Sequence, residues 1–235
     1  MLSLLILQFI AHALADFAFQ PQQWCERKDD KIFSKEHLFH IIIVFVLSWL
    51  CSMQTAFWWA ALTIAATHFL LDMLKSILSV WRKLNRFLFF VDQILHLTVI
   101  VIVTFWYSSI CPIEFPVEIA PYPAFVVLSF LLCTKPSNII IREILKSFEI
   151  PVSEPADTNE LMNAGKLIGT LERVISLALI LVDQFAAVGF IIAAKSLLRF
   201  RDTATARTEY LLIGTLLSFG IAILLGIICQ ILITI

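Results

Sequence analysis

The sequence is poor in charged residues. Asp, Glu, Lys and Arg make up 15% of its 235 residues, and the formal net charge is -1. Such a chain has no overall basic surface of the kind that attracts nucleic acid, so we expect no nucleic-acid partner. Hydrophobic residues make up 60% of the sequence, and the mean hydropathy is +0.92. Soluble domains contain roughly 45–50% apolar residues, so this excess predicts a protein whose main partner is the lipid bilayer.

The sequence also lacks the short motifs that mark common catalytic sites. It contains no HExxH, GxSxG or P-loop sequence and no dinucleotide-binding fingerprint, which argues against the enzyme classes that depend on them. Its five cysteines are scattered and include no CxxC pair, so they predict neither a disulfide framework nor a zinc knuckle.

Long apolar runs predict the fold class, an all-α, polytopic transmembrane helical bundle with seven or eight crossings. Several runs reach the ~20 residues that cross a bilayer core. The first run is expected to be a retained helix and not a signal peptide, because it has no basic segment and contains His12 and Asp16. The expected helices are 2–20, 37–52, 55–75, 87–108, 121–135 and 210–233, with a further apolar run at 166–200.

Two domains are expected. Residues 1–110 would form an N-terminal membrane bundle that holds a His/Asp site. Residues 111–235 would supply the C-terminal membrane helices, together with an amphipathic and linker segment at 136–162.

The apolar run 166–200 allows two interpretations. It is either one long tilted helix, which gives seven crossings, or a hairpin that turns near Asp183, which gives eight. Basic residues precede and follow this run, and positive charge stays on the cytoplasmic side of a membrane. This pattern favours the hairpin. The same rule places the N-terminus outside and the basic loops in the cytoplasm.

Three histidine–aspartate pairs share a spacing of four residues, which puts both side chains of a pair on one face of a helix. The order is His before Asp in the first two pairs and is reversed in the third. The third pair lies on a helix of opposite direction, so the reversal brings all three aspartates to nearly one depth. The pairs are His12 with Asp16, His68 with Asp72, and Asp92 with His96.

Six polar or ionisable groups at one depth predict a shared, cytoplasm-facing site, because each costs several kcal/mol in hydrocarbon unless it is paired or hydrated. Imidazole and carboxylate together suit zinc, manganese or iron, so the cofactor expected is a divalent metal. His40 is placed to join the same layer. The alternatives are three local hydrogen bonds within the bundle, or a proton or ion pathway. The predicted metal ligands are His12, His68 and His96, and the predicted catalytic residues are Asp16, Asp72 and Asp92.

Three further charged residues are candidates for binding an anionic substrate, namely Lys75, Glu172 and Arg173. A lysine such as Lys75 also commonly extends to the membrane surface. Glu172 and Arg173 point ~100° apart on a helix, so each needs its own counter-charge. For Arg173 we expect an aspartate of the first half of the chain, and we expect His37 to be a surface residue.

Small residues at two places predict close contacts between helices. Gly165 and Gly169 form a GxxxG pair. The last helix carries a stripe of small residues at every fourth position, made of Gly214, Ser218, Ala222 and Gly226.

Several of these segments resemble a known family. The motif LADFxxQ from Leu14 to Gln20, the His68–Asp72–Lys75 spacing, and DQxxH from Asp92 to His96 resemble the bacterial membrane family catalogued as domain of unknown function 3307. The resemblance covers residues 5–105 and implies a multi-pass protein of the bacterial inner (cytoplasmic) membrane, without implying an activity. The segments GKLIGTLER (165–173), AAKSLLRF (193–200) and EYLLIGTLLS (209–218) look like the extension of longer members.

Three functions fit this sequence. The first is an intramembrane metal-dependent hydrolase that acts on a lipid or a lipid-linked phosphate. The second is a non-catalytic scaffold or sensor with a cytoplasmic partner protein, and the third is a proton- or ion-coupled transporter. A homo-oligomer is compatible with each of them.

Overall fold

The computed structural model describes residues 1–21, 24, 35–78, 87–113, 115, 119–148, 159–199 and 205–234. All regular structure in these residues is helical, which confirms the all-α prediction. The chain forms two compact units, Met1–Leu128 and Ser129–Ile235, which we call unit 1 and unit 2. Each is described by itself.

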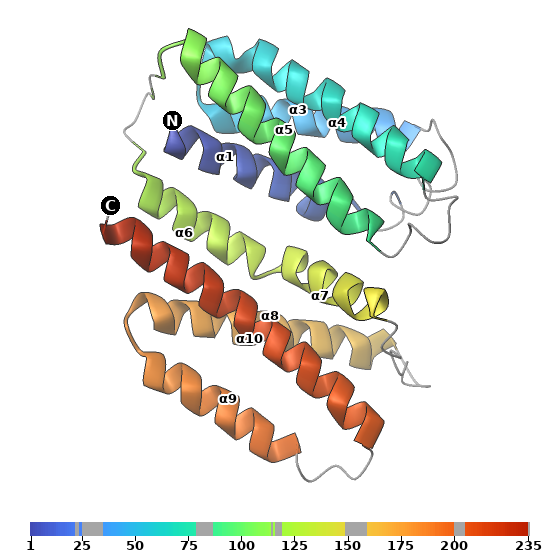
Figure 1. The fold of residues 1–235 in the computed structure, drawn as a ribbon, viewed down its shortest axis with the longest axis vertical. Helices are drawn as coiled ribbons and strands as arrows, with labels where there is room; N and C mark the ends of the chain where they lie inside the picture. Colours follow the sequence, from blue (N-terminus) through green and yellow to red (C-terminus); the bar gives the residue numbers. More distant parts are fainter. Residues whose placement is uncertain are drawn as a thin grey trace. The chain divides into compact units, whose positions relative to one another are not determined.

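Unit 1 is a bundle of four long elements (Figure 1). Helix α3 packs on α1 and α4, and α5 also packs on α1 and α4, so the four helices enclose a common centre. Short η segments extend two of them. The elements are α1 (Leu2–Ala13) with the π-helical η1 (Leu14–Ala18), α3 (Lys35–Ser52), η2 (Thr55–Phe57) with α4 (Trp58–Leu78), and α5 (Leu88–Ile110).

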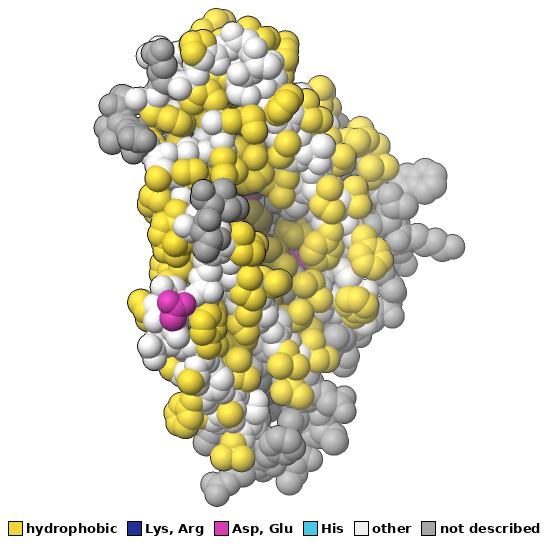
Figure 2. Space-filling model, turned by 60° about the vertical axis from the view of Figure 1, so that its left-hand side comes forward, with side chains coloured by type: hydrophobic (Ala, Val, Ile, Leu, Met, Phe, Trp, Pro, Cys, Tyr) yellow, Lys and Arg dark blue, Asp and Glu magenta, His cyan; other side chains and the backbone are white. Residues whose placement is uncertain are grey.

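The interior of unit 1 combines small, aromatic, aliphatic and polar side chains. Ala60, Ala61 and Ala65 of α4 are almost fully buried and allow neighbouring helices to approach closely. Gln8 of α1 and Ser48 of α3 are buried as well, and each donates a hydrogen bond to the other residue. Many large apolar side chains also lie on the outside, and Figure 2 shows hydrophobic side chains spread across the face in view. This distribution is typical of a bundle that lies in lipid.

The helix lengths fit a membrane location. By length and composition, four helical segments among the described residues could cross a bilayer. They are Lys35–Ser52, Thr55–Leu78, Leu88–Ile110 and Leu212–Ile233. The pair α6 (Pro121–Leu132) and α7 (Lys135–Ser147) would add a fifth span if it is one broken helix with a bend of 54°. The predicted seven or eight crossings are therefore not confirmed.

Unit 2 contains the predicted hairpin. Helix α8 (Asn159–Leu181) ends before a short turn and α9 (Phe185–Arg199) follows it, so the interpretation as one long helix is wrong. Asp183 in the turn has a φ of 61°, a left-handed conformation that ends a helix. Its side chain accepts a hydrogen bond of 2.6 Å from Gln230 of α10 (Thr205–Thr234).

The small-residue stripe of α10 does pack closely inside the chain. Ala222 is fully buried, and a Cβ atom added at Gly226 would lie 2.5 Å from Cγ2 of Ile180 on α8. The GxxxG pair behaves differently, because a Cβ at Gly165 would meet no described atom within 4 Å.

Arg173 corrects one expectation. It is 1% exposed, and among the described residues its guanidinium donates hydrogen bonds only to neutral oxygens of unit 2. Nε bonds to the Cys133 carbonyl just beyond the end of α6 (2.8 Å), and Nη1 bonds to Ser218 of the α10 stripe (2.9 Å). Nη2 bonds to Asn138 (2.6 Å) and Thr170 (3.2 Å). The aspartate expected from the first half is therefore wrong, because the Cys133 carbonyl at the negative, C-terminal end of α6 offers a nearer partner.

Candidate metal centre

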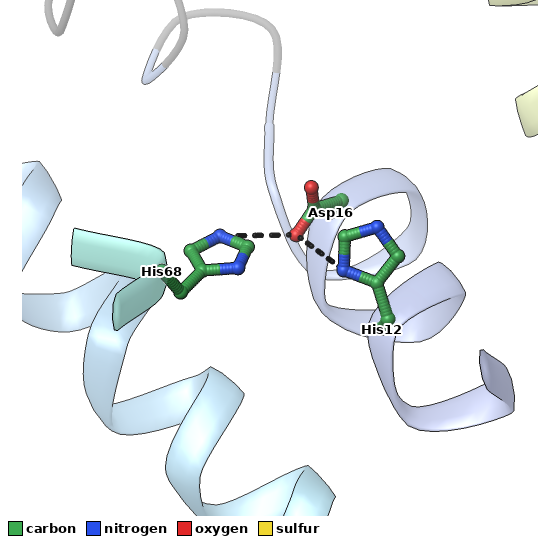
Figure 3. A group of neighbouring side chains, drawn as sticks. All are labelled: His12, Asp16 and His68. Carbon is green, nitrogen blue, oxygen red and sulfur yellow. Dashed lines mark ion pairs between the residues drawn. The ribbon is translucent and has the colours of Figure 1, made fainter. Parts of the chain in front are cut away.

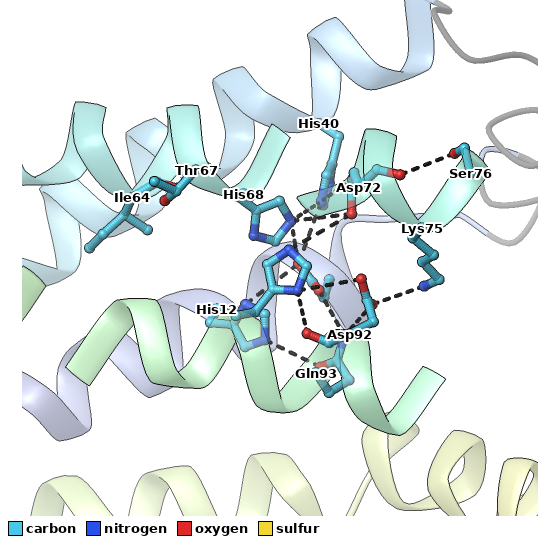
Figure 4. A network of polar contacts seen from close by, with 12 residues as sticks. His12, His40, Ile64, Thr67, His68, Asp72, Lys75, Ser76, Asp92 and Gln93 are labelled. Carbon is cyan, nitrogen blue, oxygen red and sulfur yellow. Dashed lines mark hydrogen bonds and ion pairs between the residues drawn. The ribbon is translucent and has the colours of Figure 1, made fainter. Parts of the chain in front are cut away.

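The three histidine–aspartate pairs come together within unit 1, and Figure 4 shows the polar network around His12, His68 and Asp92. They lie on α1 with η1, on α4 and on α5, and α3 adds His40. Asp16 lies within the π-helical turn η1. Such a turn holds an extra residue, and π-helical turns are frequent at functional sites. His40, His68 and His96 are each 1–2% exposed, so the cluster is almost entirely enclosed by the bundle.

One group of ligand atoms is formed by Asp16, His40 and His68. The Nε2 atoms of His40 and His68 lie 2.9 Å apart, and Oδ1 of Asp16 lies 3.5 Å from the first and 3.4 Å from the second. Figure 3 shows this carboxylate between the rings of His68 and His12, and Nδ1 of His12 is 3.7 Å from the same oxygen. Three ligand atoms from three different helical elements thus converge.

A second group is formed by Asp72, Asp92 and His96, whose ligand atoms all lie within 4.8 Å of one another. Nδ1 of His96 donates a hydrogen bond of 2.8 Å to the backbone carbonyl of Asp92. This bond fixes the tautomer of the neutral ring and leaves the lone pair on Nε2. The Nε2 atom is buried and makes no hydrogen bond with any described residue.

Asp72, a member of the second group, also faces the first. Its Oδ1 is 4.0 Å from Nε2 of His68 and 3.9 Å from Nε2 of His96, and its Oδ2 is 4.0 Å from Nε2 of His40. These distances are too long for hydrogen bonds. The carboxylate therefore faces ligand atoms of both groups, at distances longer than a hydrogen bond.

Lys75 and Gln93 complete the polar network. Nζ of Lys75 donates a hydrogen bond of 2.9 Å to Oδ2 of Asp92. The amide of Gln93 lies 3.3 Å from Nε2 of His12 and 3.4 Å from the carboxylates of Asp16 and Asp92. It can therefore orient a histidine and two carboxylates together, as outer partners of metal ligands do.

The charge of the cluster suits a cation. With neutral imidazoles, three carboxylates and one ammonium leave two negative charges in excess within a largely buried centre. Buried charge of one sign is costly unless it is compensated. A single divalent cation would neutralise it.

The structure brings together all the residues predicted as metal ligands and catalytic groups, and Lys75 with them. Glu172 and Arg173, predicted as substrate-binding residues, belong to unit 2, where Glu172 pairs with Lys195. His37 is 1% exposed and packs edge-on against Phe69, so its assignment to the surface is wrong.

His40 was left out of the predicted ligands, although the sequence carries a signal for it. His40, Val44, Ser48 and Ser52 recur at every fourth position, and all four are buried on one face of α3. That spacing is the same one that marks the three pairs.

A known protein family matches this part of the chain. Residues 4–118 match the model of the family described as a protein of unknown function (DUF3307). The resemblance drawn from the motifs is thereby confirmed. The matched region contains the whole cluster from His12 to His96. No curated protein and no solved structure matches the chain.

Proposed function

We propose that unit 1 binds a divalent transition metal at Asp16, His40 and His68. The observation that carries the proposal is the triangle formed by their three ligand atoms, with sides of 2.9, 3.4 and 3.5 Å. A point inside such a triangle lies about 1.9 Å from each atom, and bonds from zinc to nitrogen or oxygen are ~2.0–2.2 Å long. A cation therefore fits with little movement of the three helices.

The donor set selects the kind of metal. Two imidazole nitrogens and a carboxylate oxygen suit zinc, manganese or iron better than calcium or magnesium, which prefer oxygen ligands alone. His12 and Gln93 lie around the carboxylate of Asp16 and would hold it in place. Asp72, 4.0 Å from both His40 and His68, would approach as a further ligand.

The activity proposed for this centre is hydrolysis of a lipid or a lipid-linked phosphate. A bound divalent metal lowers the pKa of its water toward ~7 and so supplies a nucleophile at neutral pH. Lys75 is more accessible than the histidines and aspartates of the cluster, with 32% of its side chain exposed. Its ammonium can exchange Asp92 for a phosphate oxygen of the substrate. A membrane location would bring the polar end of a lipid to the same site.

An ion-coupled carrier is the second candidate, and a small cavity favours it. The cavity adjoins His12 and is lined by Gln8 and Ser48, the mutually hydrogen-bonded pair of α1 and α3, and by four apolar residues, Ala11, Val44, Ile64 and Ile100. The polar pair continues the polar centre further along the bundle. A cation or proton that left the cluster would meet oxygen ligands there.

Metal content tests the first step. Protein purified in detergent would be stripped with a chelator, incubated with Zn²⁺, Mn²⁺ or Fe²⁺, passed through a desalting column and analysed for metal. We expect retained metal in the unaltered protein and a loss of at least tenfold in His40→Ala. His37→Ala is the matched control, because His37 lies one turn away on the same helix and packs on Phe69. No retained metal in the unaltered protein would refute the site and would favour the scaffold or sensor.

Phosphate release tests the second step. Metal-loaded protein would be mixed with micelles that contain phosphatidate or a polyprenyl diphosphate, and inorganic phosphate would be measured over time. We expect release that depends on the metal and is lost in His40→Ala. Retained metal without release would reject the hydrolase while leaving the metal site intact. Uptake of the same metal into proteoliposomes would then support the carrier.

A further inference from the structure

Asp72, Asp92 and His96 form a second set of possible metal-ligand atoms, which shares no residue with Asp16, His40 and His68. Nε2 of His96 is the most informative atom. Its residue is 2% exposed, its lone pair is left free by the bond from Nδ1 to the Asp92 carbonyl, and Nε2 has no hydrogen-bond partner among the described residues. Burying such an acceptor without a partner is unfavourable, because it loses its hydrogen bond to water. A cation between Nε2 and the two carboxylates would remove this cost.

Asp72 links the two sets. One of its oxygens faces His96 at 3.9 Å and His68 at 4.0 Å, and the other faces His40 at 4.0 Å. A carboxylate in this position can donate one oxygen to each of two cations. The rings of His68 and His96, one from each set, have centroids only 4.0 Å apart, so the two positions are adjacent.

We propose that the centre is dinuclear, with a second divalent cation at Asp72, Asp92 and His96 and with Asp72 bridging the two cations. This inference rests on the proposed metal site and deepens it. Two-metal centres hold their ions ~3.5–4 Å apart and stabilise both the attacking and the leaving oxygen of a displacement at phosphorus. The chemical class of substrate that follows is a phosphate ester of a lipid alcohol.

The charge of the loaded centre agrees with that substrate. One divalent cation neutralises the two negative charges in excess, and a second leaves the centre with two positive charges. A phosphate monoester dianion carries the matching charge. Since Asp92 would bind the second cation, Lys75 would lose its present partner and could bind a phosphate oxygen instead.

The reaction balances without a further reactant. A metal-bound water gives one proton to a carboxylate of the cluster, and its oxygen forms a bond to phosphorus. The bond between phosphorus and the alcohol oxygen breaks at the same time. That oxygen then takes up the proton, so the products are the lipid alcohol and inorganic phosphate.

Titration with Mn²⁺ tests the second position, with bound metal counted per chain and electron paramagnetic resonance as a second readout. We expect two ions per chain and a spin-coupled signal in the unaltered protein. His96→Ala and the more conservative Asp92→Asn should each retain one ion and show the six-line signal of isolated Mn²⁺. Phosphate release should fall by more than ~100-fold in both, because outer partners alone are worth ~10–100-fold. His37→Ala should keep two ions.

The outcomes separate this inference from the one on which it rests. One ion per chain in the unaltered protein, without spin coupling, would overturn the dinuclear centre. Two ions that persist in both His96→Ala and Asp92→Asn would overturn it as well, because the second ion would then lie elsewhere. No bound ion at all would instead overturn the proposed metal site itself.

Discussion

The contact between Gly226 and Ile180 gives the most direct test of the packing in unit 2. A methyl group added at Gly226 would lie 2.5 Å from Cγ2, 3.0 Å from Cβ and 3.2 Å from Cδ1 of Ile180. The Cβ atom is fixed to the α8 backbone, so rotation of the side chain cannot relieve the whole clash. Helices α8 and α10 would have to separate. Overpacking of this kind costs ~1–3 kcal/mol.

A matched substitution removes the effect of helix propensity. Alanine stabilises a helix by ~1 kcal/mol relative to glycine. Gly226→Ala therefore combines this stabilisation with the destabilising clash against Ile180. Gly220 lies on the same helix, and a Cβ there would meet no described atom within 4 Å. Gly220→Ala should therefore be stabilising, and the difference between the two variants should equal the clash of ~1–3 kcal/mol.

Thiol labelling can measure this difference within unit 2. Cys229 of α10 is fully buried, so it reacts only when this part of the chain opens. Labelling in detergent would be followed by mass spectrometry of the peptide that contains Cys229. We expect Gly226→Ala to be labelled about 5- to 150-fold faster than Gly220→Ala, which corresponds to ~1–3 kcal/mol. Ile180→Ala in the Gly226→Ala chain should recover part of the loss. Equal rates in the two glycine variants would refute the close packing of α8 and α10.

Three further predictions follow from named contacts. Lys75→Met should raise the affinity of the protein for Mn²⁺ about tenfold, or ~1.4 kcal/mol, because the ammonium that competes with the metal for Asp92 is removed. An unchanged affinity would contradict a role for Asp92 as a ligand. Arg173→Lys should destabilise unit 2 by about 3 kcal/mol, because one ammonium cannot reach the four acceptors of the guanidinium. The loss of stability should appear as faster thiol labelling of Cys133, and an unchanged labelling rate would count against the prediction. Met53→Gly should stabilise unit 1 by about 1 kcal/mol in a thermal or denaturant unfolding experiment. Met53 is exposed and has a φ of 53°, a left-handed conformation that glycine adopts without strain. Lower stability of the variant would show that contacts of the Met53 side chain outweigh this strain.

The arrangement of unit 1 explains why the spacing of the histidine–aspartate pairs was informative. Residues four apart share a helix face whatever surrounds the helix, so the three pairs could be recognised locally. The reversed order of Asp92 and His96 matched the opposite direction of α5 and so put the three aspartates at one depth. Those two facts were sufficient to predict that the pairs meet, and the distances of 3.4 Å from His68 to Asp16 and 3.9 Å from His96 to Asp72, across helices, agree with this.

The sequence was less informative about which atoms meet which. His40 was placed near the layer but was not chosen as a ligand, and it turned out to lie 2.9 Å from His68. Arg173 was assigned to a distant aspartate, and it bonds instead to oxygens beside the break between α6 and α7. A spacing pattern specifies a face of one helix, and it does not specify how far that helix is rotated toward each neighbour.

By itself, the sequence determined that this is an all-helical chain suited to a membrane and that its titratable groups gather on three helix faces. Both follow from local properties, namely hydropathy and a period of 3.6 residues, which do not depend on distant parts of the chain. Only the tertiary structure decided that Asp16 lies on a π-helical turn, that Asp72 stands between two sets of ligands, and that a turn at Asp183 divides α8 from α9. These features depend on how helices cross and where they break, and packing between residues distant in sequence sets both.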